Sequence, residues 1–443
     1  MRTSFFQTIE NPTAFKGKLL QWAQQFREIV FLDSNNYPQK YSSYDCVLAV
    51  DAFTSIKTDC HNAFENLKEY QQTTKDWLFG YLSYDLKNDT EKLSSTNFDR
   101  LDFPDLYFFQ PKKLFLIKNN QVELHYLKMC DDELESDYEA ICNLPSATCI
   151  LQPATCHLQP AICNLPSQIE IHQRVSKEKY LEKVNTMLEH IHRGDIYEAN
   201  FCMEFFAESA TINPLETFEK LNTISQPPFA AFFKNHNHFL MCASPERYLR
   251  KESAKIISQP IKGTAKRSDD VITDEMIKEE LTVSEKERSE NIMIVDLVRN
   301  DLSRTAEKGS VEVEELCGAY TFRQVHHLVS TVVSTSEKSP VDIIKTTFPM
   351  GSMTGAPKIS AMNIIEKLEE TKRGLYSGTV GYFTPENDFD FNVVIRSILY
   401  NAAAKYVSFS VGSAITSLSD PESEYEECLL KAKAMLEVLG KTS

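Results

Sequence analysis

Long apolar runs are missing from this sequence of 443 residues. A membrane-spanning helix needs about 20 consecutive apolar residues, and every apolar stretch here is interrupted before that length. Residues 1–13 also lack the apolar core of a signal peptide, because Glu10 and Asn11 interrupt them. We therefore expect a cytoplasmic protein that has no membrane partner.

Basic residues are also fewer than acidic residues. The chain has 47 Lys and Arg residues against 63 Asp and Glu residues, which gives a formal net charge of −16. Nucleic acids and anionic membrane surfaces attract proteins of the opposite balance, so we expect neither as a partner. An anionic substrate would have to be held by local cations, against the average field of the protein.

Zinc sites usually contain pairs of cysteines two to four residues apart. No such pair occurs in residues 140–168, where cysteine recurs at a regular spacing. Residues 140–168 form four seven-residue units, each with one cysteine: Cys142, Cys149, Cys156 and Cys163. The repeated prolines exclude a continuous helix, and the low complexity is typical of a disordered linker, with metal binding as the alternative. Without an export signal, we expect reduced thiols. The linker separates an N-terminal region, 1–139, from a second region, 169–443.

The composition, 42% hydrophobic and 25% charged, suits a large folded core. Stretches rich in β-branched and aromatic residues predict strands at 45–52, 106–117, 239–243, 255–260 and 406–411. Helical periodicity covers 274–306, 357–370 and 421–439. Antiparallel hairpins combined with long helices predict an α+β architecture.

One helix and the strand after it have clear patterns. Ser176 is placed to cap a helix that ends at Gly194. The following segment alternates, with one apolar face made by Tyr197, Ala199, Phe201, Met203 and Phe205, and a second face made by Glu198, Asn200, Cys202 and Glu204. We expect a strand with one buried face and a polar face that lines a cavity.

Two residues in connections are candidates for catalysis. Glu246 follows Pro245 between two predicted strands, where a carboxyl group can enter a cleft and act as a general acid or base. Lys262 precedes Gly263, and a lysine becomes a nucleophile when burial or a nearby cation lowers its pKa from about 10.4. Taken alone, each is also consistent with an ordinary solvated side chain.

Carboxylates on two predicted helices suit a magnesium ion. Glu287 and Glu290 share one face of the first helix, and Glu424, Glu427 and Lys431 share a face of the last. Mg²⁺ takes oxygen ligands and keeps several waters, so carboxylates from two helices are enough to hold it. The alternative is an ordinary surface salt bridge between Glu427 and Lys431.

Five segments together resemble the chorismate-utilising enzymes. They are Ser-Pro-Glu-Arg at 244–247, Pro-Ile-Lys-Gly-Thr at 260–264, the run from Glu-Arg-Ser-Glu-Asn to Arg-Asn-Asp-Leu at 287–302, Gly-Ser-Met-Thr-Gly-Ala-Pro-Lys at 351–358, and Glu-Tyr-Glu-Glu-Cys-Leu-Leu-Lys-Ala at 424–432. The resemblance covers about residues 170–440, and fainter similarity at 31–34 and 79–85 extends it to the N-terminal region. It implies a two-layered α/β sandwich with large antiparallel sheets and outer helices, in which residues 1–139 belong to the same unit.

The family includes component I of anthranilate synthase and of aminodeoxychorismate synthase, and isochorismate and salicylate synthases. Its members differ in the middle of the Pro-Ile-x-Gly-Thr motif, where the aminodeoxychorismate-forming enzymes have lysine and the others typically alanine. Lys262 therefore implies conversion of chorismate and ammonia to 4-amino-4-deoxychorismate, on the route to 4-aminobenzoate and folate. In this picture Lys262 attacks C2 of chorismate, the 4-hydroxyl group leaves with a proton from Glu246, and ammonia then adds at C4.

The resemblance also implies the remaining site residues. Glu290 and Glu427 would hold Mg²⁺, with Glu287 and Glu424 as outer support, and His327 matches the family's active-site histidine. The residues that would surround the substrate carboxylates are Thr354, Tyr376, Arg396, Gly412 and Lys431. A bidentate contact with a carboxylate is the natural role of Arg396.

Three positions depart from the family pattern. Glu198 stands where the isochorismate and salicylate synthases carry a water-activating lysine and the amino-transferring members commonly have glutamine. This argues against water as the nucleophile, and we hypothesise that the carboxylate helps to hold ammonium. Met350 stands where glycine is usual, and Ala414 where the family commonly has glycine in a Gly-x-Gly turn, so the added methyl group is expected to crowd a backbone contact to the substrate near Gly412.

Two rivals and two partners follow from the resemblance. The rivals are anthranilate synthase component I and a non-catalytic regulatory subunit of the same fold. The sequence has no Gly-x-Cys-x-Gly element of the glutaminase type, so we expect a separate glutamine amidotransferase subunit to supply ammonia. Release of pyruvate to give 4-aminobenzoate would need a separate aminodeoxychorismate lyase, since the predicted helix 421–439 ends close to Ser443.

Overall fold

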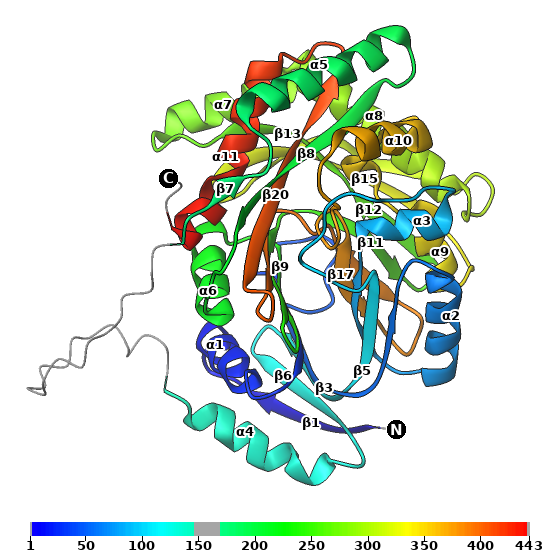
Figure 1. The fold of residues 1–443 in the computed structure, drawn as a ribbon. Helices are drawn as coiled ribbons and strands as arrows, with labels where there is room; N and C mark the ends of the chain where they lie inside the picture. Colours follow the sequence, from blue (N-terminus) through cyan, green and yellow to red (C-terminus); the bar gives the residue numbers. More distant parts are fainter. Residues whose placement is uncertain (1, 146–168, 441–443) are drawn as a thin grey trace, which may run out of the picture.

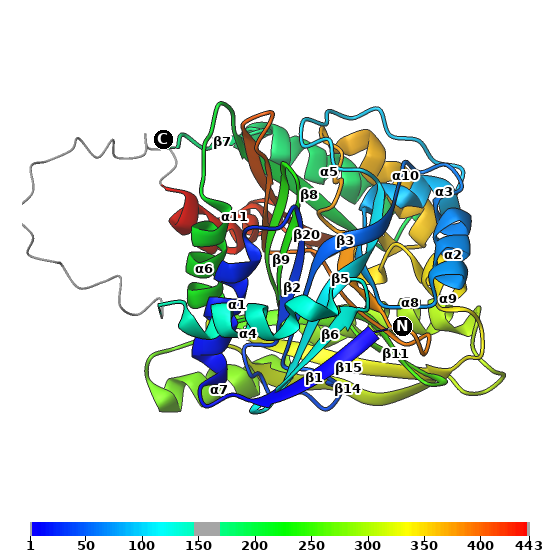
Figure 2. The ribbon, with the colours of Figure 1, turned by 90° about the horizontal axis from the view of Figure 1, so that it is seen from below.

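The computed structural model describes residues 2–145 and 169–440. Its strands form one continuous sheet in which every pairing between named strands is antiparallel. The sheet bends into two layers, and helices cover its outer faces (Figures 1 and 2). The predicted α+β class, with a two-layered sandwich of large antiparallel sheets and outer helices, is confirmed.

The first layer begins with the N-terminal strand and ends with the strand after Gly194. Its order in space is β1 (Arg2–Thr8), β6 (Gln121–Leu127), β5 (Leu106–Lys118), β3 (Cys46–Thr58), β2 (Glu28–Asp33), β9 (Phe229–Asn235), β10 (His238–Ser244), β19 (Ser397–Asn401), β20 (Tyr406–Thr416) and β8 (Glu198–Ala207). The short strands β7 (His172–Gln173) and β16 (Gly355–Ala356) pair with β8.

The second layer branches from β5. The first residues of β5 pair with β4, whereas its later residues pair with β6, so the sheet divides along one edge of this strand. From β4 (Leu78–Leu82) the order continues through β17 (Thr379–Phe383), β18 (Phe389–Asn392), β11 (Arg247–Glu252), β12 (Lys255–Gln259), β15 (Val325–Thr335), and finally β13 (Ile261–Lys266) and β14 (Glu312–Thr321).

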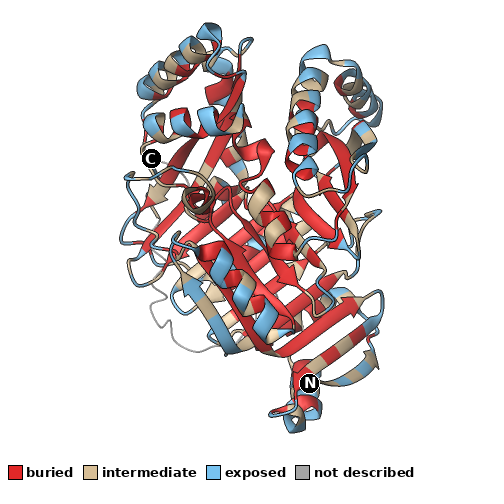
Figure 3. Ribbon diagram, turned by 90° about the vertical axis from the view of Figure 1, so that its right-hand side faces the viewer, coloured by how far each residue is buried: buried red, intermediate tan, exposed pale blue. Residues whose placement is uncertain are grey.

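Two hydrophobic cores hold the layers and helices together. One core lies between the first layer and the helices α1 (Pro12–Ala23), α4 (Leu134–Asn143), α5 (Lys177–Arg193), α6 (Pro214–Ser225), α10 (Lys358–Leu368) and α11 (Pro421–Leu439). The other lies between the layers and continues under α2 (Ala63–Thr74), α8 (Glu285–Ser303) and α9 (Pro340–Thr347). Figure 3 shows the buried strands in the centre and the exposed helix faces outside. The short helix α3 (Lys87–Thr90) and α7 (Val271–Val283) complete the set of α-helices in the described ranges.

The local patterns around β8 are confirmed. The Ser176 hydroxyl accepts a hydrogen bond from the backbone N–H of Lys179 and caps α5, and Gly194 ends the helix at φ +88°. The apolar face of β8 from Ala199 to Phe205 packs in the outer core, while Cys202 on the opposite face packs in the core between the layers. Tyr197, predicted on the apolar face, is 69% exposed because it precedes the strand.

Two predicted boundaries change, those of the helix at 274–306 and of the linker at 140–168. The helix predicted at 274–306 is two helices, α7 and α8, because Ser284 leaves the helical conformation and caps α8 through Glu287 N–H. In α11 the buried stripe is Glu424, Tyr425, Cys428, Ala432, Met435 and Leu439, whereas Leu429 and Leu436 are only partly buried. The predicted linker 140–168 overlaps the end of α4, and residues 146–168 lie outside the described residues.

No helix in the ranges 2–145 and 169–440 combines the length and the hydropathy that crossing a membrane requires.

Close packing of β17 against its neighbours makes Gly381 a sensitive position. Gly381 lies opposite Gly80 of β4, and an added Cβ would come within 2.1 Å of Asp390 O and 2.6 Å of a ring atom of Phe391. We expect Gly381→Ala to lower the free energy of unfolding by about 1–3 kcal/mol. Gly17→Ala in α1 is the control, because no atom lies within 4 Å of its added Cβ; it should raise the stability by up to about 1 kcal/mol. Urea unfolding followed by tryptophan fluorescence measures both, and equal effects would contradict this packing.

Candidate functional site

The ends of the two sheet layers meet at an ion pair. Lys262 of β13 and Glu198 of β8 are joined by a contact of 2.9 Å between Lys262 Nζ and Glu198 Oε1. Glu198 is 2% exposed, and its second oxygen, Oε2, is buried without a hydrogen-bond partner. Strands that come last in their respective layers thus place a cation and an anion in direct contact.

The pKa of Lys262 is raised in this environment. Burial alone would lower it, but the negative charges of Glu198, Glu290 and Glu427 outweigh burial. The condition derived from the sequence, a lowered pKa, is therefore not met in the protein without substrate. Lys262 is protonated at neutral pH and has to lose a proton before it can act as a nucleophile.

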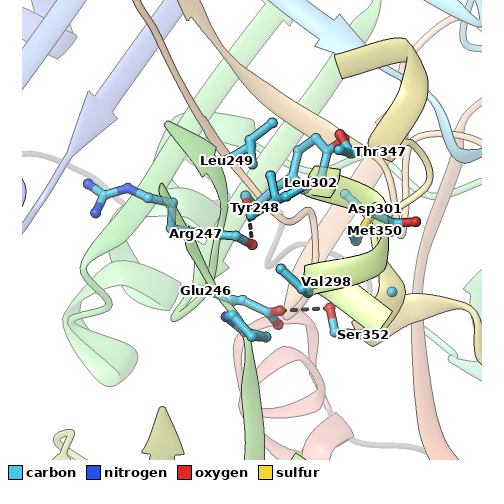
Figure 4. A pocket seen from close by; sticks show the side chains of 13 residues that line it. Glu246, Arg247, Tyr248, Leu249, Val298, Asp301, Leu302, Thr347, Met350 and Ser352 are labelled. Atoms are coloured by element: carbon cyan, nitrogen blue, oxygen red, sulfur yellow. Dashed lines mark hydrogen bonds between the residues drawn. The ribbon is translucent and has the colours of Figure 1, made fainter. Parts of the chain in front are cut away.

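Glu246 lies in the connection between β10 and β11, as predicted, and is 4% exposed. Burial raises its pKa to about 7, although the Ser352 hydroxyl donates a hydrogen bond of 2.7 Å to Oε1 and favours the anion. Figure 4 shows the carboxyl group directed at Ser352, while the Arg247 side chain points away. A cavity of about 20 Å³, lined in part by Glu246, Val298 and Asp301, lies behind it. At neutral pH this group can therefore either give or accept a proton.

The four predicted metal-binding carboxylates lie on α8 and α11, and their charges act on one another. Burial is the main cause that raises the pKa of Glu287, Glu290 and Glu424, and it brings that of Glu290 to about 7. The charge of Glu427 adds to the rise at Glu287 and Glu424. Burial opposes the lowered pKa of Glu427, but the Lys431 ammonium 2.6 Å away prevails.

This donor set fits Mg²⁺. In the described residues there is no group of three or more His, Cys, Asp or Glu side chains close enough to hold one metal ion. A hard ion that keeps most of its waters needs only one or two carboxylates, and a cation would stabilise the charged form of Glu290, whose pKa burial raises. Glu290 and Glu427 face the lysine from two different helices, and both contribute to its raised pKa.

Basic groups border the other side of the site. In the described part of the chain, no carboxylate lies within ion-pair distance of the Arg396 guanidinium, although burial and the nearby Tyr376 and Glu427 affect its pKa. His327 of β15 has a pKa lowered to about 3 by burial and by Arg396, so its imidazole is neutral. Its Nδ1 lies 2.8 Å from the Thr264 hydroxyl, on the strand that carries Lys262. A neutral donor or acceptor and an unpaired cation are available for an anionic ligand.

Three of the residues predicted to surround the substrate carboxylates make contacts within the fold. The Thr354 hydroxyl donates to the carbonyl groups of Met350 and Gly351 within its own turn. Lys431 donates to Gly412 O at 2.8 Å, and a Cβ at Gly412 would come within 2.5 Å of Cys202 Sγ, so close strand packing explains this glycine.

The hydroxyl group of Tyr376 is buried beside Cys202 Sγ. Met350 packs in the core between the layers, and Ala414 lies opposite Asn200 on β20.

Sequence reasoning missed two positioning residues. Ser352 is the hydrogen-bond partner of Glu246, and Asn291 donates to the backbone carbonyl groups of Lys262 and Leu328. Asn291 directly follows Glu290, so its place in that motif was a signal that its amide fixes β13 against α8. Ser352 lies in the segment 351–358, but nothing in its spacing indicates contact with a residue more than 100 positions earlier.

Comparisons with known proteins agree with this arrangement. A family model described as chorismate binding enzyme matches residues 27–437, and the chain belongs to this family. A probable chloroplastic aminodeoxychorismate synthase of Oryza sativa subsp. japonica is 35% identical over 406 residues, which are 85% of this chain and 45% of that protein. The chain thus spans less than half of the length of this relative.

Relatives named aminodeoxychorismate synthase and relatives named anthranilate synthase match this chain with similar identity and coverage. Aminodeoxychorismate synthase component 1 of Bacillus subtilis (strain 168) is 30% identical, covering 87% of this chain and 80% of that protein. Anthranilate synthase component 1 of Thermus thermophilus is 32% identical, covering 81% of this chain and 76% of that protein. The structure of anthranilate synthase component I from Streptococcus pneumoniae TIGR4 has a TM-score of 0.73 at 24% identity, with 90% and 93% coverage, and shows the shared fold.

The raised pKa of Glu246 predicts a pH-dependent stability. Between its ordinary value of 4.5 and about 7, the folded protein holds a proton that the unfolded chain releases, so stability falls as pH rises through this range. Glu246→Gln removes this dependence and should gain stability relative to the original protein, by about 2–3 kcal/mol more at pH 8 than at pH 5. Urea unfolding at both pH values measures the difference, and Glu208→Gln at an exposed glutamate is the control. The same gain at both pH values would contradict a raised pKa.

Proposed function

We propose that this protein is an aminodeoxychorismate synthase component I, which converts chorismate and ammonia to 4-amino-4-deoxychorismate. The observation that carries the proposal is the position of Lys262, a buried amine that faces Glu198 and lies in the field of Glu290 and Glu427. An amine at this point can form a covalent bond to a ring carbon, which alanine cannot. The similarity to relatives named aminodeoxychorismate synthase supports the same choice.

The chemistry divides between a nucleophile and an acid. The Lys262 amine attacks C2 of chorismate, the ring double bond shifts, and the C4 hydroxyl group leaves as water with the proton of Glu246. Ammonia then adds at C4, the double bond shifts back, and the bond between C2 and Lys262 breaks. A Glu246 pKa of about 7 suits this role, because near neutral pH much of the side chain carries the proton that it must donate.

Cations hold the substrate in an otherwise acidic site. Arg396, which has no carboxylate partner in the described residues, would make a bidentate contact with a substrate carboxylate. Glu290 and Glu427, with Glu287 and Glu424 beside them, would hold Mg²⁺. When bound, the ion would neutralise the second carboxylate and offset the charges of the site.

The ammonia would come from a separate glutamine amidotransferase subunit, and a separate lyase would release pyruvate to form 4-aminobenzoate for folate. Component 1 in the name of the Bacillus relative is consistent with such a partner subunit. The second candidate function is that of anthranilate synthase component I, because the Thermus relative matches over a similar length. Lys262 favours the first function, since formation of anthranilate needs no amine nucleophile from the protein.

Replacement of Lys262 tests the function directly. With chorismate, Mg²⁺ and ammonium, we expect the original protein to form 4-amino-4-deoxychorismate and Lys262→Ala to lose at least about a hundredfold in rate. Lys266→Ala on the same strand is the matched control, because this lysine is exposed, and it should keep the original rate. Chromatography with mass detection identifies the product; anthranilate and pyruvate from the original protein would establish the second function instead.

Removal of metal tests the carboxylate set. Dialysis against EDTA should abolish turnover, and Mg²⁺ should restore it, because the substrate carboxylate would otherwise face several negative charges. Glu290→Gln should raise the Mg²⁺ concentration for half-maximal rate by about tenfold or more. Unchanged turnover after complete metal removal, checked by elemental analysis, would rule out a metal requirement.

A further inference from the structure

Lys262 needs a base, and the structure assigns one. We propose that Glu198 accepts the proton of Lys262 before the amine attacks the substrate and returns it when the amine is released. This inference rests on the proposed function, because it concerns the same covalent step. It goes beyond that function by giving a catalytic role to Glu198, which the proposed function leaves without one.

Geometry singles out Glu198 among the acidic residues near the lysine. Its Oε1 is the only carboxylate oxygen within ion-pair distance of Lys262 Nζ in the described residues, and the separation of 2.9 Å is short enough for direct transfer of a proton. Glu290 and Glu427 act on Lys262 through their charge alone, without a hydrogen bond or ion pair to it. Glu246 also acts at a distance and already has the role of the acid.

The surroundings of Glu198 favour a shared proton. A buried carboxylate is normally satisfied by several hydrogen-bond donors, but Glu198 Oε2 has none, and Lys262 is the one cation paired with the other oxygen in the described residues. Water has little access to compete for the proton, since Glu198 is 2% exposed and the lysine side chain 13%. The same carboxylate keeps Lys262 protonated in the resting protein and is the nearest acceptor during turnover.

The proton balance closes over one cycle. The Lys262 ammonium gives its proton to Glu198, and the neutral amine forms the bond to C2 while Glu246 protonates the departing hydroxyl group. Ammonium returns a proton to Glu246 as it becomes ammonia, which bonds to C4 and carries the positive charge into the product. The bond from C2 to Lys262 then breaks with its electron pair on nitrogen, and Glu198 returns the proton to the amine. The net change is chorismate plus ammonium to aminodeoxychorismate plus water.

A pH profile separates a local base from deprotonation by solvent. In the original protein the proton passes from Lys262 to Glu198 across the 2.9 Å contact and not to solvent, so the rate of adduct formation should not rise between pH 5.5 and 7. It should fall above about pH 7, where Glu246 loses its proton. With Glu198→Gln, which preserves the shape of the side chain, solvent has to remove the proton. The rate should then drop at least about a hundredfold at pH 6 and rise about tenfold per pH unit.

The measurement is rapid quenching of protein mixed with chorismate and Mg²⁺ without ammonium, followed by intact-protein mass analysis of the Lys262 adduct. Glu208→Gln, at an exposed glutamate just beyond β8, is the matched control and should behave like the original protein. Near-ultraviolet circular dichroism checks the fold of each variant. The profile of the original protein tests the proposal even if Glu198→Gln does not fold, because a rate that rises through pH 5.5–7 overturns it.

Other outcomes are equally decisive. An adduct that forms at the same rate in Glu198→Gln overturns the role of Glu198 and leaves the proposed function intact. A variant in which only the KM for ammonium rises, with unchanged adduct formation, also overturns it and identifies Glu198 as an ammonium site instead. Product without any adduct in the original protein refutes the covalent step itself.

Discussion

The contact between Lys262 and Glu198 joins the two layers of the molecule at their far ends. The layers share β5, separate along its edge, and meet again where β8 of one layer faces β13 of the other. Removal of one partner from a largely buried ion pair strongly destabilises the folded protein, because the remaining charge is left uncompensated. The geometry of the site therefore depends on how the two layers lie relative to each other. The distance between Lys262 Nζ and Glu198 Oε1 is a direct measure of that arrangement.

An excess of negative charge lies around this pair and determines the electrostatics of the site. Four glutamates from β8, α8 and α11 act on Lys262 through their charges, and one of them, Glu427, is paired with Lys431: Glu198, Glu287, Glu290 and Glu427. Such a field opposes a dicarboxylate ligand unless a cation accompanies it. It also holds Lys262 in its charged form. A protein with a net charge of −16 can in this way restrict anion binding to one location.

Much of the arrangement could be predicted from the sequence where local rules apply. The cap at Ser176, the end of α5 at Gly194 and the two faces of β8 follow from side-chain chemistry and periodicity, and each is confirmed. The order of the motifs placed Glu246, Lys262 and the helical carboxylates in one site. The pairing of Lys262 with Glu198 could not be predicted, because it depends on two strands that are distant in sequence and on no periodic signal. The raised pKa of Lys262 could not be predicted either, because it depends on the charges that other elements bring to the site.

The division of the sheet at β5 has a consequence for how this protein can be cut or shortened. Strand β2 covers one edge of β9, and β4 covers one edge of β17, so strands from the first part of the chain protect the hydrogen-bonding edges of strands from the second part. A fragment that begins at residue 169 would contain every proposed catalytic side chain but would expose both edges. Unpaired edges recruit other strands, so such a fragment is prone to aggregate. By pairing with these edges, the N-terminal region keeps them from pairing with another molecule. None of the proposed catalytic residues lies in this region.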